Sequence, residues 1–138
     1  MANKYLFLDT GALYSYFDEN DKDYAVILST IKTSQEELIT TDYVVDELIT
    51  LLRFRKVPLA KFRNFINDLF SGEICNVWKI NDELISKAWE IMQKYSDHEF
   101  SFTDCTSFAV MKENNITLAC SLDKHFKEFG VQVIPEIK

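Results

Sequence analysis

Hydrophobic and polar positions follow two alternating spacings along the chain. Short apolar runs predict strands at residues 5–8, 38–40, 75–80, 117–121 and 131–134. The segments between them carry apolar residues at helical spacing and predict helices at about 11–17, 22–33, 42–56, 58–72, 81–95, 103–114 and 123–128. Strands that alternate with helices form parallel sheets covered on both faces. The pattern therefore predicts an α/β fold of three layers, α/β/α, with a central parallel sheet.

Several polar residues and glycines predict where helices begin and end. Asp42, Asn81 and Thr103 are suited to cap the helices that they open, because their side-chain oxygens accept hydrogen bonds from free N–H groups. Gly72 and Gly130 are suited to end helices. No repeat, low-complexity stretch or linker interrupts the pattern, so we expect residues 1–138 to form one domain.

The composition is that of an ordinary folded protein with an acidic balance. Hydrophobic residues make up 47% of the chain and charged residues 27%, and there are only three glycines and two prolines. The net charge of -7 argues against nucleic-acid binding through overall charge. A local basic segment, or contact with phosphate through a metal ion, is compatible with it.

Cysteine usage and hydropathy favour a cytoplasmic protein that has no contact with membranes. The three cysteines are odd in number and have no paired short spacing, which fits buried thiols in a reducing compartment better than disulfides or a zinc site. No apolar run approaches the length that spans a bilayer. Asp9 interrupts the first apolar stretch, which makes that stretch a poor signal peptide.

Four carboxylates lie beside apolar runs, where an unpaired charge is costly to bury. Asp9 follows the first predicted strand and Asp123 follows the fourth, while Asp104 lies at the start of a helix. Glu47 lies in the helix that follows the second strand. Ligands of parallel sheets bind beyond the carboxyl ends of the strands, so we expect the four groups to converge there.

A cluster of carboxylate oxygens selects hard divalent cations, chiefly Mg2+ or Mn2+. Two such ions about 3.5–4 Å apart can activate water and stabilise the leaving oxygen of a phosphodiester. Each acid taken alone is more simply a turn former or a helix cap. On the same reasoning, Asp46 is a solvated neighbour of Glu47.

Four segments together resemble the PIN domain family, and in particular its VapC-like ribonuclease toxins. They are residues 7–13 (FLDTGAL), 46–48 (DEL), 102–108 (FTDCTSF) and 121–126 (SLDKHF). Each motif is short, but their order and spacing cover nearly the whole chain. The resemblance implies a metal-dependent endoribonuclease, the toxin of a toxin–antitoxin pair, with RNA as substrate, a cognate antitoxin and a homodimer as partners.

The resemblance also assigns roles to residues. Asp9, Glu47, Asp104 and Asp123 would be the catalytic, metal-binding acids. The hydroxyls of Thr10, Thr103 and Ser121 would orient carboxylates or water. The family pattern is not strict around Glu47, so Asp46 could share its role. Cys105 and Cys120 flank two of the motifs and are expected to be packing residues, because thiolate is a poor ligand for Mg2+.

Residues 48–67 contain five basic residues and no acid. The five, Arg53, Arg55, Lys56, Lys61 and Arg63, are candidates for contacts with RNA phosphates. Phe54 and Phe62 lie among them and could stack on bases. The same segment could instead be a solvated turn or bind an acidic partner.

Other interpretations of the chain are weaker or remain alternatives. A noncatalytic PIN-like module that binds RNA or protein is the main alternative, although an intact set of mutually repelling acids argues against it. A haloacid-dehalogenase-type phosphatase would need a second Asp two residues after Asp9, where Gly11 stands. A receiver domain would need an acidic pair beside the end of the first strand, which is not clear here. We expect His98 and His125 to be surface or helix-packing residues rather than general bases.

Overall fold

A parallel sheet of five strands, in the order β3–β2–β1–β4–β5, forms the centre of the computed structural model, which describes residues 4–136. The strands are β1 (Tyr5–Leu8), β2 (Glu37–Thr41), β3 (Asn76–Trp78), β4 (Leu118–Cys120) and β5 (Gln132–Ile134). The helices are α1 (Thr10–Phe17), α2 (Tyr24–Thr33), α3 (Asp42–Phe54), α4 (Leu59–Phe70), α5 (Asp82–Lys94), α6 (Phe102–Glu113) and α7 (Lys124–Phe129). The predicted order of elements is confirmed, with shifts of a few residues at their ends.

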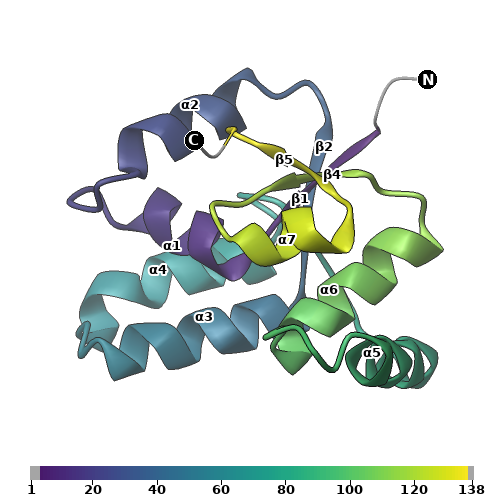
Figure 1. Cartoon of the computed structure of the whole chain (residues 1–138). Coiled ribbons are helices and arrows are strands. Elements are labelled where there is room, and N and C mark those ends of the chain that lie inside the picture. The colour runs from purple at the N-terminus through teal and green to yellow at the C-terminus, as the bar shows by residue number, and fades with distance from the viewer. Residues whose placement is uncertain (1–3, 137–138) are drawn as a thin grey trace.

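Helices cover both sides of the sheet. In Figure 1, α1, α2 and α4 gather at the left of the strands, while α5, α6 and α7 lie in front and at the right. Leu6, Phe7 and Leu8 of the central strand β1 are fully buried, as expected of a strand covered on both faces. The predicted three-layer fold is therefore confirmed.

The strands after β1 are added first on one side of it and, from β4 onward, on the other, so the strand order reverses between β1 and β4. β2 and β3 lie on one side of β1, and β4 and β5 lie on the other. The ends of three strands are joined there. The Asp9 N–H donates to the Cys120 carbonyl at 3.4 Å, and the Thr40 hydroxyl donates to the Leu8 carbonyl at 2.7 Å. Ligand sites of parallel sheets form at such points.

Two predicted helix caps are wrong, each because a neighbouring hydroxyl takes the position. Thr41, not Asp42, caps α3 by accepting the Val44 N–H at 3.2 Å. The Asp42 carboxylate instead accepts the Ile80 N–H at 3.0 Å. Ile80 lies beyond the end of β3, which is therefore shorter than the predicted strand at 75–80. At α6 the cap is Ser101, not Thr103.

Other end signals are confirmed. Asn81 caps α5 by accepting the Leu84 N–H at 2.9 Å, and Gly130 ends α7 in the left-handed conformation with φ of 106°. Cys75, Cys105 and Cys120 are free and buried, as expected. No helix within residues 4–136 combines the length and the apolar character that crossing a membrane requires.

A cluster of phenylalanines joins α6 to α7. The Phe108 ring stacks on Phe129, with centroids 4.3 Å apart, and meets Phe126 and Phe100 edge-on at 4.9 and 5.0 Å. Phe108 is fully buried. Because α6 and α7 carry Asp104 and Asp123 at their N-terminal ends, this packing fixes where the two carboxylates lie.

We expect Phe108→Ala to lower the free energy of unfolding by about 3–5 kcal/mol, because it leaves a cavity among three other rings. Phe54→Ala is the matched control. Its side chain is 82% exposed, so the same substitution there should change stability by no more than about 0.5 kcal/mol. Urea denaturation of both variants measures the difference, and a loss below about 1 kcal/mol for Phe108→Ala would contradict the assigned packing.

Candidate active site

The four predicted carboxylates surround one cavity of about 250 Å³ beyond the carboxyl ends of β1 and β4. Its lining consists of Asp9, Thr10, Gly11, Val44, Glu47, Leu51, Thr103, Asp104, Ser107, Asp123 and Phe126. The lining residues come from or adjoin α1, α3, α6 and α7, so segments far apart in the sequence meet here. The structure thus brings all four acids together. Ser107, which was not predicted, also reaches this wall.

Asp9 is the most buried of the four acids, with 5% of its surface exposed. It caps α1: its Oδ1 accepts the Ala12 N–H at 2.7 Å, and its Oδ2 accepts the Ser121 hydroxyl at 2.5 Å. Burial raises the pKa of Asp9 to about 7, and the charges of Asp123 and Asp104 act in the same direction. The two hydrogen bonds oppose this shift in part. Without a neighbouring cation, Asp9 is therefore only partly ionised at neutral pH.

Asp104 and Asp123 each occupy the start of a helix. Asp104 forms a capping box with Ser101, accepting its N–H at 3.1 Å, and Asp123 caps α7 by accepting the His125 N–H at 2.9 Å. Burial raises the pKa of Asp104, and hydrogen bonds from Ser101 and His125 lower it in part. The side chain of Asp104 is 12% exposed and that of Asp123 is 41% exposed. Solvent exposure of these acids therefore increases from Asp9 through Asp104 to Asp123.

Glu47 reaches the cavity from α3. The Thr10 hydroxyl donates to its Oε1 at 2.6 Å, which fixes the carboxylate against the start of α1. Asp46, the neighbouring acid, is exposed and is not part of the cavity wall. The geometry separates the two residues that the sequence left as alternatives, and it favours Glu47.

The three predicted hydroxyls differ in what they contact. Thr10 holds Glu47, and Ser121 holds Asp9 while its oxygen accepts the Asp123 N–H at 3.0 Å. Thr103 lines the cavity, but no hydrogen bond joins its hydroxyl to a carboxylate of the described residues. Two of the three hydroxyls thus orient acids in the way that metal sites commonly require.

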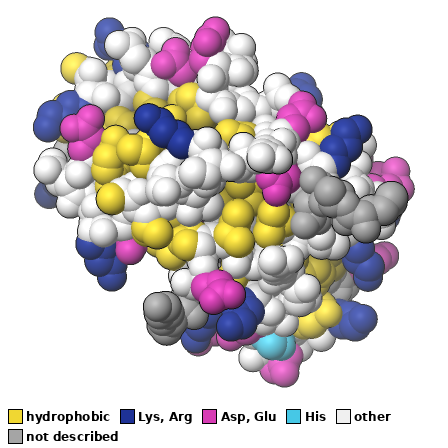
Figure 2. Space-filling model, turned by 90° about the horizontal axis from the view of Figure 1, so that it is seen from above, with side chains coloured by type: hydrophobic (Ala, Val, Ile, Leu, Met, Phe, Trp, Pro, Cys, Tyr) yellow, Lys and Arg dark blue, Asp and Glu magenta, His cyan; other side chains and the backbone are white. Residues whose placement is uncertain are grey.

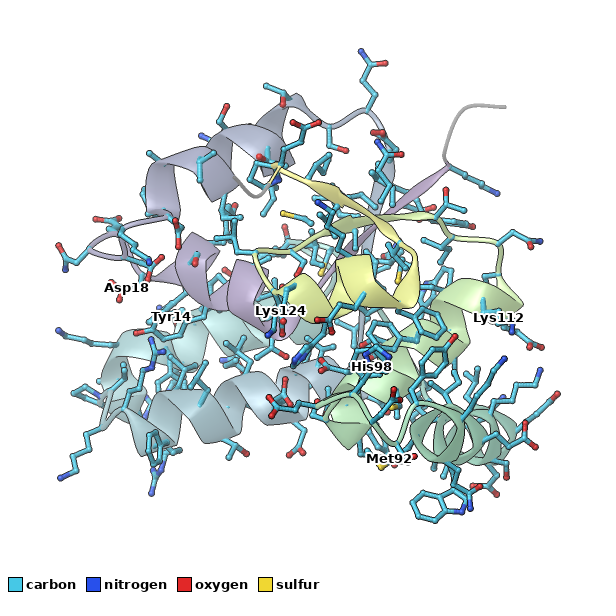
Figure 3. All side chains as sticks on the ribbon, viewed as in Figure 1. Tyr14, Asp18, Met92, His98, Lys112 and Lys124 are labelled. Carbon is cyan, nitrogen blue, oxygen red and sulfur yellow. The ribbon has the colours of Figure 1, made fainter. Side chains whose placement is uncertain are left out.

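His125 is a site residue that the sequence analysis missed. Its ring Nδ1 lies 3.0 Å from Oδ2 of Asp104 and 3.4 Å from Oδ1 of Asp123. The available signal was its place two residues after Asp123 in the first turn of a helix. His98 behaves as expected of a packing residue: its ring stacks on Phe100 at 4.9 Å, beneath α7 in Figure 3.

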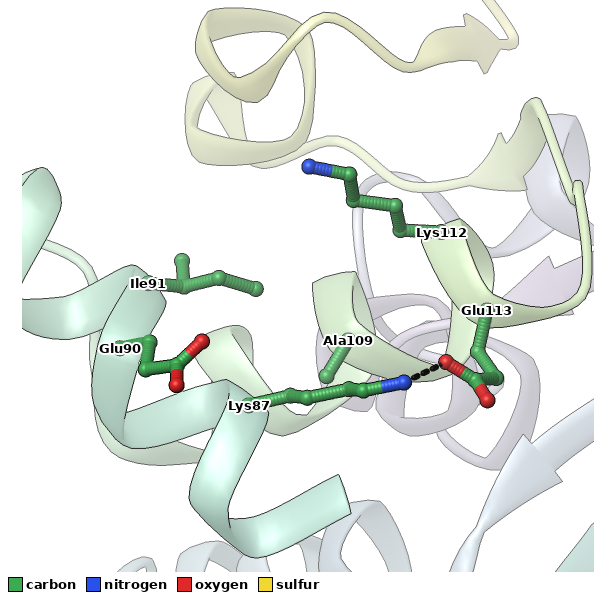
Figure 4. Close-up of a pocket in the computed structure, with 6 residues that line it drawn as sticks. All are labelled: Lys87, Glu90, Ile91, Ala109, Lys112 and Glu113. Carbon is green, nitrogen blue, oxygen red and sulfur yellow. Dashed lines mark hydrogen bonds and ion pairs between the residues drawn. The ribbon is translucent and has the colours of Figure 1, made fainter. Parts of the chain in front are cut away.

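The charge balance of the cavity distinguishes it from other hollows. None of the residues that line it is Lys or Arg. A hollow of about 230 Å³ between α5 and α6 also contains acids, but there Lys87 pairs with Glu113 (Figure 4). Lys87 also pairs with Glu83. Within residues 4–136, no Lys or Arg forms an ion pair with the acids of the first cavity, and the His125 ring is the group that lies beside Asp104 and Asp123. The acids offer only oxygen atoms, so the donor set fits a hard divalent cation.

The neighbouring thiols do not alter this donor set. Burial raises the pKa of Cys120 to about 12 and that of Cys105 to about 11, so both remain protonated. Both side chains are fully buried in the core.

The five basic candidates Arg53, Arg55, Lys56, Lys61 and Arg63 are all exposed but lie outside the cavity wall, around the connection from α3 to α4. The Arg55 guanidinium lies over the Tyr14 ring at 4.3 Å. The Tyr14 hydroxyl donates to Asp18 at 3.1 Å, and Figure 3 shows Tyr14 and Asp18 on the left. Phe54 is exposed and free to stack. Phe62 is 2% exposed, so its predicted stacking role is wrong.

Comparison of the sequence with known proteins finds similarity to ribonucleases of the VapC type. The chain is 28% identical over 137 residues to the 23S rRNA-specific endonuclease VapC20 of Mycobacterium tuberculosis, covering 95% of this chain and 99% of that protein. It is 27% identical over 124 residues to a VapC ribonuclease of Archaeoglobus fulgidus, covering 86% and 77%.

Solved structures agree with the sequence relatives. The crystal structure of VapC20, described as a Sarcin-Ricin loop cleaving toxin, superimposes with a TM-score of 0.83 at 25% identity, covering 91% of this chain and 95% of that one. VapBC2 from Rickettsia felis, solved with a promoter DNA fragment, shares the fold at 11% identity, with a TM-score of 0.68 and coverage of 94% and 96%. The sequence model of the PIN domain matches residues 6–132, and the chain belongs to the PIN domain family.

Proposed function

We propose that this protein is a metal-dependent endoribonuclease that hydrolyses phosphodiester bonds in RNA and acts as the toxin of a toxin–antitoxin pair. The observation that carries the proposal is the convergence of four carboxylates on one cavity that no Lys or Arg lines. Membership of the PIN family and similarity to ribonucleases of the VapC type support the same chemistry.

In this proposal Asp9, Glu47, Asp104 and Asp123 hold Mg2+ or Mn2+. A divalent ion supplies Lewis-acid stabilisation of the phosphate and a water nucleophile at neutral pH. The chain itself supplies orientation: Ser121 fixes the Asp9 carboxylate, and Thr10 fixes that of Glu47. Thr103 lines the same cavity, and in this proposal its hydroxyl would orient water or substrate.

The proposed partners follow from the same relatives. Because VapC20 acts on 23S rRNA, ribosomal RNA is the first substrate class to test. We further propose a cognate antitoxin, a homodimer and a cytoplasmic location, with residues 1–138 acting as one domain. The exposed basic segment around the α3–α4 connection would contact RNA phosphates. By contrast, the face at which the strands begin mixes basic, acidic and hydrophobic side chains without a basic stripe (Figure 2).

Substituting an acid by its amide tests the site. We expect Asp9→Asn and Asp104→Asn each to lower the rate of RNA cleavage by at least about tenfold, because substituting even the outer partners of metal ligands costs about 10–100-fold. The fold should survive, since Asn can replace Asp9 as the cap of α1 and Ser101 still caps α6 when Asp104 is changed. Asp46→Asn, at an exposed acid beside Glu47, is the matched control and should cleave normally.

Cleavage of purified rRNA and growth after expression in bacteria are the two readouts. Growth arrest and RNA fragments are expected for the wild type and for Asp46→Asn alone. Full metal-dependent activity in Asp9→Asn would remove that residue from the proposed site.

Stability should depend on pH and on divalent ions together. The pKa of Asp9 is raised from 3.8 to about 7 in the folded protein, so between these values the folded state binds a proton that the unfolded state has lost. The free energy of unfolding of the metal-free protein should therefore fall as pH rises from about 4 to about 7. Ions that bind only the folded state offset this loss, by about 2.7 kcal/mol at a hundred times their Kd.

Thermal denaturation with EDTA, and with millimolar Mg2+ or Mn2+, measures this effect at pH 5 and pH 8. We expect the increase in melting temperature to be larger at pH 8, and Asp9→Asn to abolish most of it. A melting temperature that neither ion shifts at pH 8 would argue against a formed site.

Charge removal tests the RNA-binding segment. The double variant Arg53→Gln/Arg63→Gln should weaken RNA binding and reduce the slope of log Kobs against log[salt] by about 1.4, because each phosphate contact on single strands contributes about 0.7. The control is Lys22→Gln/Lys32→Gln, which removes the same charge at two exposed lysines outside the segment. A slope that is equal in the two double variants would refute the assignment.

A further inference from the structure

The ring of His125 lies at a position that a metal ligand of this cavity could occupy. Its Nδ1 is 3.0 Å from Oδ2 of Asp104 and 3.4 Å from Oδ1 of Asp123. The first contact is a hydrogen bond, and an ion bound between the two groups would take the place of its proton. One ligand atom from each of the three residues falls within 4.8 Å of the other two. Ligands at right angles around an ion, each about 2.1 Å from it, lie about 3 Å apart. The spacing of the three groups thus matches neighbouring ligands of one cation.

The ring is held in this place from several sides. The backbone N–H of His125 donates to Asp123 at 2.9 Å, which ties the residue to the start of α7. The ring meets Phe100 edge-on at 5.5 Å, and Phe100 is itself buried. The side chain of His125 is only 18% exposed. A ligand fixed in this way needs little further ordering to bind.

Asp104 keeps a free oxygen for the same ion. Its Oδ2 accepts the Ser101 N–H and faces the His125 ring, whereas Oδ1 accepts no hydrogen bond from the described residues. A carboxylate oxygen has two lone pairs, so Oδ2 can accept the Ser101 N–H and still contact a cation beside the His125 ring, and Oδ1 stays available as well.

We propose that His125 is a nitrogen ligand of the divalent ion and makes this site bind Mn2+ more tightly than Mg2+. The proposal rests on the proposed function, and it adds a ligand to the four acids. Mg2+ demands oxygen ligands and keeps several of its waters, whereas first-row transition ions accept imidazole nitrogen readily. One imidazole among carboxylates thus favours Mn2+ without excluding Mg2+.

Binding of the two ions to His125→Gln tests the proposal without measuring cleavage. Isothermal titration should show that the substitution raises the Kd for Mn2+ by at least about tenfold. The Kd for Mg2+ should change by less than about threefold, since Mg2+ gains little from nitrogen. His98→Gln is the matched control: it removes the other histidine, which stacks on Phe100 and lies beside Asp97 and Glu128 rather than the site acids, and it should leave both constants unchanged.

Electron spin-echo spectra of the Mn2+-loaded wild-type protein give a direct reading that does not depend on how a variant folds. We expect nitrogen hyperfine coupling from a coordinated imidazole, which persists in His98→Gln and disappears in His125→Gln. Mn2+ that binds without nitrogen coupling would overturn the role of His125 and leave the proposed nuclease intact. Failure of the wild type to bind either ion would overturn both.

Discussion

Mutual repulsion among four carboxylates is the physical constraint on which the rest of this structure depends. Asp9, Glu47, Asp104 and Asp123 line a single cavity that no Lys or Arg lines. Burial is the main cause of the raised pKa values of Asp9 and Asp104, and repulsion among Asp9, Asp104 and Asp123 adds to it. The elements around the cavity are arranged so that such a cluster can persist in a folded protein.

The local device that makes the cluster tolerable is the helix start. Asp9 and Asp123 cap α1 and α7, and Asp104 belongs to the capping box of α6. Backbone N–H groups there satisfy carboxylate oxygens, and the amino ends of helices favour negative charge. Three of the four acids thus stabilise helix starts and also line the cavity, whereas Glu47 lies within α3 and is held by Thr10. The phenylalanine packing between α6 and α7 then holds two of these helix starts at a fixed separation.

Much of the fold and of the acidic cluster could be predicted from the sequence, because both depend on spacing along the chain. Strand ends and helical stripes are local signals, and parallel strands bring their carboxyl ends to one edge. Caps were harder to assign where two oxygen-bearing side chains compete within one or two residues, as Thr41 does with Asp42 and Ser101 with Thr103. Local sequence does not decide which of two neighbouring oxygens caps the helix. The choice depends on residues far away in the chain, such as Ile80, whose N–H donates to the Asp42 carboxylate.

His125 and Phe62 show what lay beyond sequence reasoning. The direction of the His125 ring depends on how α7 is rotated against α6, and the burial of Phe62 depends on which face of α4 meets the core. Local spacing carried part of this information, since His125 lies two residues after Asp123 and Phe62 shares a helical stripe with Ile66 and Leu69. Packing between elements decides whether such a residue meets the cavity, the core or solvent.

The double use of the acids has a consequence for how such a protein can change over generations. Asn serves as a helix cap about as well as Asp does. A single nucleotide change from Asp to Asn at position 9 would therefore preserve the cap while removing one of the repelling charges. If Asp9 has its proposed role, one mutational step could give relatives that keep the fold and lose the activity.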